Sequence, residues 1–171
     1  DLLDAALAAI DLLDGGNPNE RDREQRGEHL LRIATDQSQR ELEVRRAALR
    51  SVQPGDPKLT IPILESFLAE TDERLRIEAV RTLREIESPR VVDLLLTVAG
   101  DGKAPLALRL EAVAGLGRAG DKSRDQLVTL MDAAEPRLRR EAARSSIDLE
   151  LDATVAARRD RLVGTTLAAG E

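Results

Sequence analysis

The fold of this chain is indicated by the stretch LRIEAVRTL, residues 75–83, which has three further copies in the sequence. The copies read VRRAALRSV at residues 44–52, LRLEAVAGL at 108–116 and LRREAARSS at 138–146, and all four align without gaps. Four copies at a near-constant period predict a repeat protein built from one supersecondary unit. The second residue of each copy is an arginine, and successive arginines are spaced by 31, 33 and 30 positions: Arg45, Arg76, Arg109 and Arg139.

Each copy is predicted to be a helix, because its apolar residues follow a helical period. Counted from the arginine, positions −1, +3, +4 and +7 are apolar, apart from Ser146 at +7 of the fourth copy. These positions form one stripe of a helix with 3.6 residues per turn. Further apolar helices are predicted between the copies, over residues 57–70, 89–99 and 123–134. The short joints between them favour antiparallel neighbours.

The joints carry helix start and stop signals. Asp56 before Pro57 and Ser88 before Pro89 each combine an N-cap residue with a proline at the first helical position. Thr71 is a further candidate cap, placed before Asp72, and Gly120 is expected to end a helix. The predicted unit is therefore a helix hairpin of about 31 residues that stacks on its neighbours.

The pattern D-x-x-L-R-x-x-A-V-x-x-L at residues 72–83, with L-G-x-x-G-D at 116–121, resembles the HEAT-like repeats of the phycobilin-lyase type. The resemblance covers residues 38–150 well and extends more weakly to residues 19–37. It implies an all-α fold, an α/α superhelix, which is a right-handed alpha solenoid of stacked antiparallel helix hairpins. It also implies that the second helices line a concave face that binds other proteins.

Three segments are expected along the chain. Residues 1–18 form an N-terminal amphipathic end helix and a turn, residues 19–150 form about four HEAT-like repeats, and residues 151–171 form a C-terminal capping helix and a loose tail. The end helix either packs on the first repeat or forms a seam for another chain or domain. Because the chain begins with Asp1 and not with Met, we expect a trimmed or processed chain, and its compartment stays open.

The composition argues against several classes of protein. The net charge of −6 argues against a general nucleic-acid binder, and the absence of cysteine excludes disulfides and thiolate zinc sites. One phenylalanine, without Tyr or Trp, removes the usual stacking platforms for bases and flavins. No run approaches 18 apolar residues, so no membrane span is predicted.

A structural ladder is expected along the repeated arginines. In three copies an acid stands four residues before the arginine, where both side chains share one helix face. The acid at this place favours the helix dipole, and the arginine can reach carbonyls or carboxylates of a neighbouring repeat. In the family that the chain resembles, such residues form a ladder between repeats. The expected ladder residues are Glu41, Arg45, Asp72, Arg76, Arg109, Glu135 and Arg139.

A second set of side chains is the candidate partner-binding face. Positions +1 and +5 from the ladder arginine share a face that points away from the apolar stripe. Repeat 3 interrupts this basic face with apolar residues, among them Ala107 and Ala114. Two interpretations stay open, a groove for an acidic or amphipathic partner segment and a solvated face with local ion pairs. The candidate residues are Arg46, Arg50, Ile77, Arg81, Leu110, Arg140 and Arg144.

Other motifs fit the repeat turns better than a chemical role. G-x-G-x-x-G at residues 115–120 follows a predicted helix and not the strand that a dinucleotide site needs. Residues 100–103 resemble a phosphate loop but lack the flanking Ser or Thr, and His29 has no second ligand. The oxygen-rich residues between 11 and 22 do not match a calcium loop. No catalytic, cofactor-binding or metal-binding residue is therefore predicted.

The sequence thus favours a non-enzymatic scaffold for protein–protein interaction that uses the concave face of a HEAT-like solenoid. Two alternatives stay open: a subunit or homologue of a HEAT-repeat lyase-type enzyme, and a structural module that spaces two domains of a larger protein. The partner and the oligomeric state are not indicated by the sequence.

Overall fold

The computed structural model describes residues 20–37 and 41–167, and every regular element among them is helical. The chain is an all-α protein of the alpha-solenoid class. The helices are α2 (Glu20–Thr35), α3 (Leu42–Ser51), α4 (Ile61–Leu68), α5 (Glu73–Leu83), α6 (Pro89–Gly100), α7 (Leu106–Gly117), the 3-10 helix η1 (Gly120–Ser123), α8 (Arg124–Leu130), α9 (Pro136–Ser145) and α10 (Ala153–Leu167).

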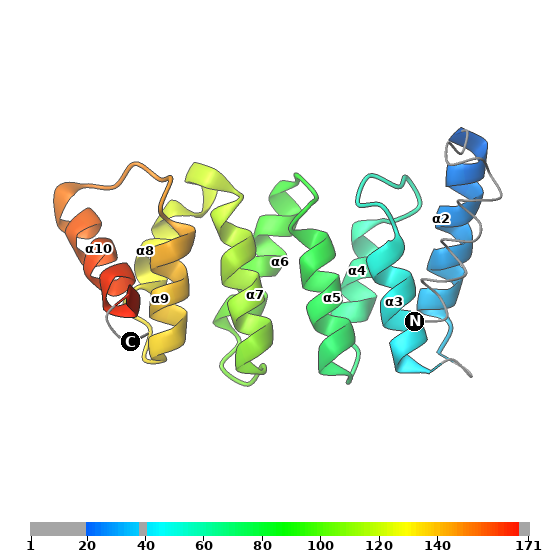
Figure 1. Ribbon diagram of the computed structural model, residues 1–171, viewed down its shortest axis with the longest axis horizontal. Coiled ribbons are helices and arrows are strands. Elements are labelled where there is room, and N and C mark those ends of the chain that lie inside the picture. The colour runs from blue at the N-terminus through cyan, green and yellow to red at the C-terminus, as the bar shows by residue number, and fades with distance from the viewer. Residues whose placement is uncertain (1–19, 38–40, 168–171) are drawn as a thin grey trace. The chain divides into compact units, whose positions relative to one another are not determined.

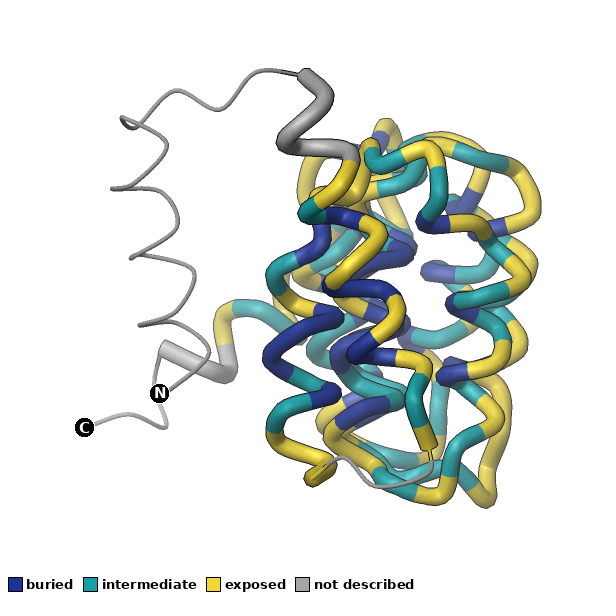
Figure 2. The backbone as a smooth tube through the Cα atoms, turned by 90° about the vertical axis from the view of Figure 1, so that its right-hand side faces the viewer, coloured by how far each residue is buried: buried dark blue, intermediate teal, exposed yellow. Residues whose placement is uncertain are grey.

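The chain divides into two compact units at the bond between Thr82 and Leu83. Unit 1 contains α2 to α5, and its core includes Leu49, Leu64 and Phe67, which are all almost fully buried. In both units the buried residues lie on the inner sides of the helices, and the turns are mostly exposed (Figure 2). This is the burial that the apolar stripe of each repeat predicts.

Unit 2 contains α6 to α10, and its core includes Leu95, Leu108, Leu116, Leu127 and Leu138. The helices α7 and α9 pack against each other, with α6 and α8 behind them (Figure 1). All five of these leucines come from the repeated copies or from the helices predicted between them. The second helices α7 and α9 therefore share one side of the unit.

The helix starts agree with the sequence signals in two places. Helix α6 begins at Pro89 after Ser88, although the Ser88 side chain makes no capping hydrogen bond. Asp72 precedes α5, and its Oδ1 accepts a hydrogen bond from the Leu75 amide at 2.8 Å. The cap of α5 is therefore Asp72 itself and not Thr71, because a carboxylate three residues before the amide has the N-cap geometry.

The predicted helix over residues 57–70 begins later than expected. Asp56 caps a turn instead, where its Oδ1 accepts from the Lys58 amide at 2.8 Å and its carbonyl accepts from the Leu59 amide at 3.0 Å. Helix α4 then starts at Ile61, with a proline in its first turn. Proline suits the first turn of a helix at either site, so the local sequence alone does not choose between them.

The two ends of the chain were expected to hold an end helix and a loose tail. The last helix, α10, continues through Gly164 to Leu167, beyond the point where a loose tail was expected. The predicted end helix at 1–18 and residues 168–171 lie outside the described residues, as do the oxygen-rich residues from 11 to 19 that did not match a calcium loop. Among the helices that are described, none combines the length and apolar character needed to cross a bilayer.

Candidate functional site

The candidate partner-binding residues belong to a row of three exposed or half-exposed positions on each second helix. Positions −2, +1 and +5 from the ladder arginine are spaced i, i+3 and i+7, so they lie on one side of a helix. Positions +1 and +5 were selected from the sequence, whereas position −2, which the same register includes, was named only at Ala107. The residues missed at this position are Glu43, Arg74 and Arg137.

In unit 1 three of the four row arginines lie beside a carboxylate. Glu43 lies 2.7 Å from Arg46 in its own helix and 2.9 Å from Arg74 of α5, measured between nitrogen and oxygen atoms. Arg81 lies 3.7 Å from the carboxylate of Glu78. These ion pairs match the solvated-face interpretation of the sequence.

Two further row residues of unit 1 complete this surface. Arg50 is exposed and contacts no acid among the described residues, and Ile77 is half-buried on α5. The row of unit 1 is therefore a mixture of signs with a single apolar side chain. Such a surface offers neither a uniform charge nor a continuous apolar strip.

In unit 2 the two rows differ in kind. We call Ala107, Leu110 and Ala114 of α7 the apolar row, and Arg137, Arg140 and Arg144 of α9 the arginine row. The two rows occupy the same three repeat positions, because each residue of the second row lies thirty positions after its counterpart in the first. Since α7 packs on α9, an apolar strip lies beside a basic strip.

The arginines of this row are only weakly engaged by the chain itself. Arg144 lies 3.8 Å from the Glu141 carboxylate, and its side chain is 51% exposed. Arg140 donates from Nε to the Pro136 carbonyl at 3.4 Å, and the Arg137 guanidinium contacts no acid among the described residues. Exposed pairs of this kind contribute about 0–1 kcal/mol, so the guanidinium groups remain available to another molecule.

A glycine holds the two helices close together. A Cβ atom added at Gly117 would lie 2.8 Å from the Ser145 carbonyl oxygen and 3.0 Å from its Cβ. The end of α7 therefore approaches the backbone of α9 more closely than a side chain would allow. This contact fixes the spacing between the apolar row and the arginine row.

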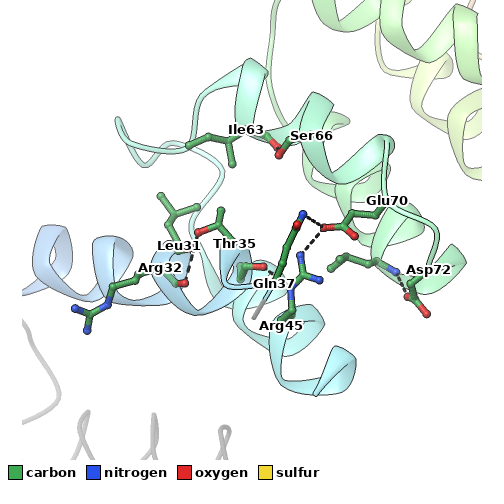
Figure 3. A network of polar contacts seen from close by, with 11 residues as sticks. Leu31, Arg32, Thr35, Gln37, Arg45, Ile63, Ser66, Glu70 and Asp72 are labelled. Carbon is green, nitrogen blue, oxygen red and sulfur yellow. Dashed lines mark hydrogen bonds and ion pairs between the residues drawn. The ribbon is translucent and has the colours of Figure 1, made fainter. Parts of the chain in front are cut away.

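Three of the four ladder arginines contact backbone carbonyls of the segment before their own helix. Arg45 is 4% exposed, and its Nε donates to the Ala34 carbonyl at the end of α2 at 2.8 Å. Its Nη2 lies 2.6 Å from Oε1 of Glu70, which also accepts from Gln37 at 2.9 Å (Figure 3). Arg45 thus joins three segments of unit 1.

Two other ladder arginines make equivalent contacts in unit 2. Arg109 donates from Nε to the Ala99 carbonyl at 3.0 Å, and Arg139 donates to the carbonyls of Ala133 and Ala134 at 2.9 and 3.0 Å. A cation at these carbonyls is favourable, because they lie at the negative end of the preceding helix. In unit 1, the Arg76 Nε is buried and makes no such bond.

The ladder acids do not pair with the arginines that follow them. Glu135 is the N-cap of α9 and accepts from the Arg137 amide at 3.1 Å, as Asp72 does for α5. Glu41 holds the N-cap position of α3 without a side-chain bond. The acids thus stand at the starts of their own helices, while Arg45, Arg109 and Arg139 contact the preceding segment.

The motifs rejected as chemical sites lie in turns. Gly115 and Gly117 belong to the last turn of α7, and Gly120 begins η1 with a φ of 60°. Asp101 accepts from the Lys103 amide at 2.9 Å, which forms the turn that follows α6. The described residues hold no group of three or more His, Cys, Asp or Glu side chains placed to bind a metal ion.

A pocket of about 480 Å³ in unit 2 has both of its arginines in ion pairs. It is lined by residues 84–89 and by parts of α6, α7 and η1. Arg84 pairs with Glu111 at 3.0 Å, and Arg118 pairs with Glu85 at 2.9 Å. None of the row residues lines this pocket.

One carboxylate of unit 1 has a shifted ionisation. The Glu28 carboxylate accepts a hydrogen bond from Lys58 Nζ at 2.6 Å. This hydrogen bond, together with the charge of Lys58, lowers the pKa of Glu28. The pair joins α2 to the turn before α4 and lies away from the exposed rows.

Residues 27–108 match the family model of HEAT repeats, which is a match to the repeat type in general. No curated protein matches the chain. The matched segment runs from α2 to the beginning of α7.

Proposed function

Because residues 27–108 are HEAT-like repeats, we propose that the chain is a non-enzymatic scaffold that binds a partner protein through the exposed rows of its second helices. HEAT repeats commonly mediate protein–protein interaction, and their fold is generally non-enzymatic. The proposal assigns partner contact to α3 and α5 in unit 1 and to α7 and α9 in unit 2.

The observation that supports this proposal is that the buried positions of the repeats are alike while the exposed row positions differ. Positions −1, +3 and +4 hold similar apolar residues in every copy and are buried or half-buried. The exposed row has mixed charge on α3, an isoleucine between two arginines on α5, apolar residues on α7 and arginines on α9. Stacking of the repeats requires only the buried positions to be alike. The row residues can therefore differ between repeats, and these differences can serve the recognition of a partner protein.

The test is a crosslinking pull-down from a lysate of the source organism. Three chains are compared: the wild type, an Arg50/Arg81/Arg140/Arg144→Glu variant of the rows, and an Arg90/Arg118/Arg124/Arg161→Glu variant. The last variant changes the net charge equally and leaves the row arginines intact. Circular dichroism shows that helicity is equal in all three.

The proposal predicts a partner that the wild type and the control variant capture and the row variant loses. Equal capture of the partner by all three chains would show that these arginines are a solvated surface and do not bind the partner. Capture by none would instead favour a structural spacer within a larger protein, which was the other non-enzymatic alternative.

A further inference from the structure

We propose that unit 2 alone carries the main binding site, and that its ligand is an acidic amphipathic helix of a partner protein. This inference rests on the proposed function and names the chemistry of the partner. The helix would lie along the seam between α7 and α9, with its apolar stripe on the apolar row and its carboxylates on the arginine row.

The apolar row is unusual for the outer side of a repeat. Ala107 is exposed and Leu110 and Ala114 are half-exposed, so three apolar side chains follow one another at i, i+3 and i+7. The row spans seven residues, or ~10 Å along the helix axis. A strip of this length and spacing matches two turns of an amphipathic helix, whose anchors recur at the same intervals.

The arginine row is a local excess of positive charge in an acidic chain. Helix α9 carries four arginines and one glutamate, while the whole chain has a net charge of −6. One of the four, Arg139, is held by the carbonyls of Ala133 and Ala134, and the other three form the row. Charge complementarity therefore points to an acidic ligand on this helix.

Unit 1 lacks this combination. Arg46 and Arg74 share Glu43, and Arg81 lies beside Glu78, so Arg50 is the one row arginine of unit 1 that contacts no acid among the described residues. The only apolar row residue of unit 1 is Ile77. An acidic helix placed there would meet Glu43 between two of the arginines. The difference between the two units thus locates the site on α7 and α9.

The geometry also fixes the pattern of the ligand. Packed helices lie ~8–10 Å apart, so a third helix above the seam touches both rows at once. Its leucines or isoleucines would face α7, and glutamates or aspartates about one third of a turn away would face α9. Glu141 lies between two members of the arginine row, and the ligand must replace its 3.8 Å contact with Arg144.

The test measures binding of a fluorescent synthetic peptide to the full chain by anisotropy. The probe is a peptide of ~18 residues, or five helical turns, with leucine along one stripe, glutamate beside it and alanine elsewhere. Two control peptides replace every glutamate by lysine or every leucine by serine. Each titration is made at low and at high salt, because screening weakens contacts between exposed charges.

Two variants of the chain locate the site. Arg137/Arg140/Arg144→Glu reverses the arginine row, and Arg50/Arg74/Arg81→Glu makes the same change of charge in unit 1. A third variant, Leu110→Ser, removes the largest side chain of the apolar row without altering charge. Circular dichroism and urea midpoints confirm that all three variants fold.

The inference predicts saturable binding of the leucine–glutamate peptide that weakens about tenfold or more in the arginine-row variant and severalfold in Leu110→Ser. The unit 1 variant should change the affinity less than twofold. Equal loss in both charge variants, equal binding of the lysine peptide, or no saturable binding would overturn the inference. The proposed function would still stand in these cases if the pull-down partner is lost with the row variant.

Discussion

Replacement of Arg45 by methionine tests the structural role of the ladder arginines most sharply. Methionine keeps an unbranched apolar stem but removes the guanidinium. The Ala34 carbonyl then loses its 2.8 Å hydrogen bond, and Glu70 loses its 2.6 Å ion pair. The side chain of Glu70 is only 16% exposed, so its carboxylate loses its counter-charge in a partly desolvated site. The Gln37 side chain is then its remaining hydrogen-bond partner.

The expected cost follows from these contacts. Removal of one partner from a fully buried ion pair costs about 3–5 kcal/mol. Glu70 keeps one hydrogen bond and some contact with water, so we expect a loss of about 2–3 kcal/mol for Arg45→Met. Arg109→Met removes a carbonyl contact and no ion pair. It should therefore cost about 1 kcal/mol, the net value of one typical hydrogen bond.

The assay is urea unfolding followed by circular dichroism. With a slope of about 1–3 kcal/mol per molar urea, Arg45→Met should lower the midpoint of unit 1 by about 1–2 M. Arg50→Met is the matched control, since Arg50 is exposed and contacts no acid among the described residues, and it should change stability by less than about 0.5 kcal/mol.

A double variant separates the two contributions of Arg45. In Arg45→Met/Glu70→Gln the uncompensated carboxylate is gone, so the total loss should be smaller than the sum of the two single losses. If Arg45→Met costs no more than Arg50→Met, the ladder arginines do not hold the hairpins together and the reasoning fails.

Three further predictions use the same unfolding assay or a proton titration. Gly117→Ala should cost about 1–3 kcal/mol, because its methyl group meets the Ser145 carbonyl at 2.8 Å; unchanged stability would show that α7 and α9 are not held so closely. Asp72→Ala should cost about 1 kcal/mol as a lost helix cap, and a loss for Asp72→Asn equal to it would argue against capping. Lys58→Met should raise the pKa of Glu28 towards its ordinary value in an NMR titration. Because that pKa is lowered in the folded protein, the stabilisation is present above the ordinary pKa and is lost as the pH falls through the lowered one; an unshifted titration would exclude Lys58 as the cause.

Local periodicity was enough to predict the class of the fold. The apolar stripe of residues 75–83 identified α5, and the same stripe identified α3, α7 and α9, because burial of that stripe is what the repeats share. Ser88 and Pro89 also marked the start of α6 correctly. These features depend on residues within one or two turns of each other, which a sequence pattern records directly.

Contacts between distant segments could not be predicted in the same way. Arg45 was expected to reach carbonyls or carboxylates of a neighbouring repeat, but the sequence did not say which; they are the Ala34 carbonyl and the Glu70 carboxylate. The helix expected from Pro57 begins at Ile61, because the Asp56 side chain is used in a turn. In both cases the local signal allowed more than one outcome, and packing selected among them.

The candidate surface was predicted in part. Arg140 and Arg144 were selected by their register, but Arg137 was missed, although it lies three residues before Arg140 on the same side of α9. The contrast between the two units required the structure, since the pairing of Glu43 with Arg74 joins two different helices. A pattern within single repeats does not contain that contact.

The most direct test of the central claim is an amide-exchange footprint of the wild-type chain bound to the partner that the pull-down identifies. The account predicts that the partner slows exchange in peptides from the second helices, with the strongest effect in α7 and α9. Protection confined to α4, α6 and α8, with no change in the second helices, would contradict it.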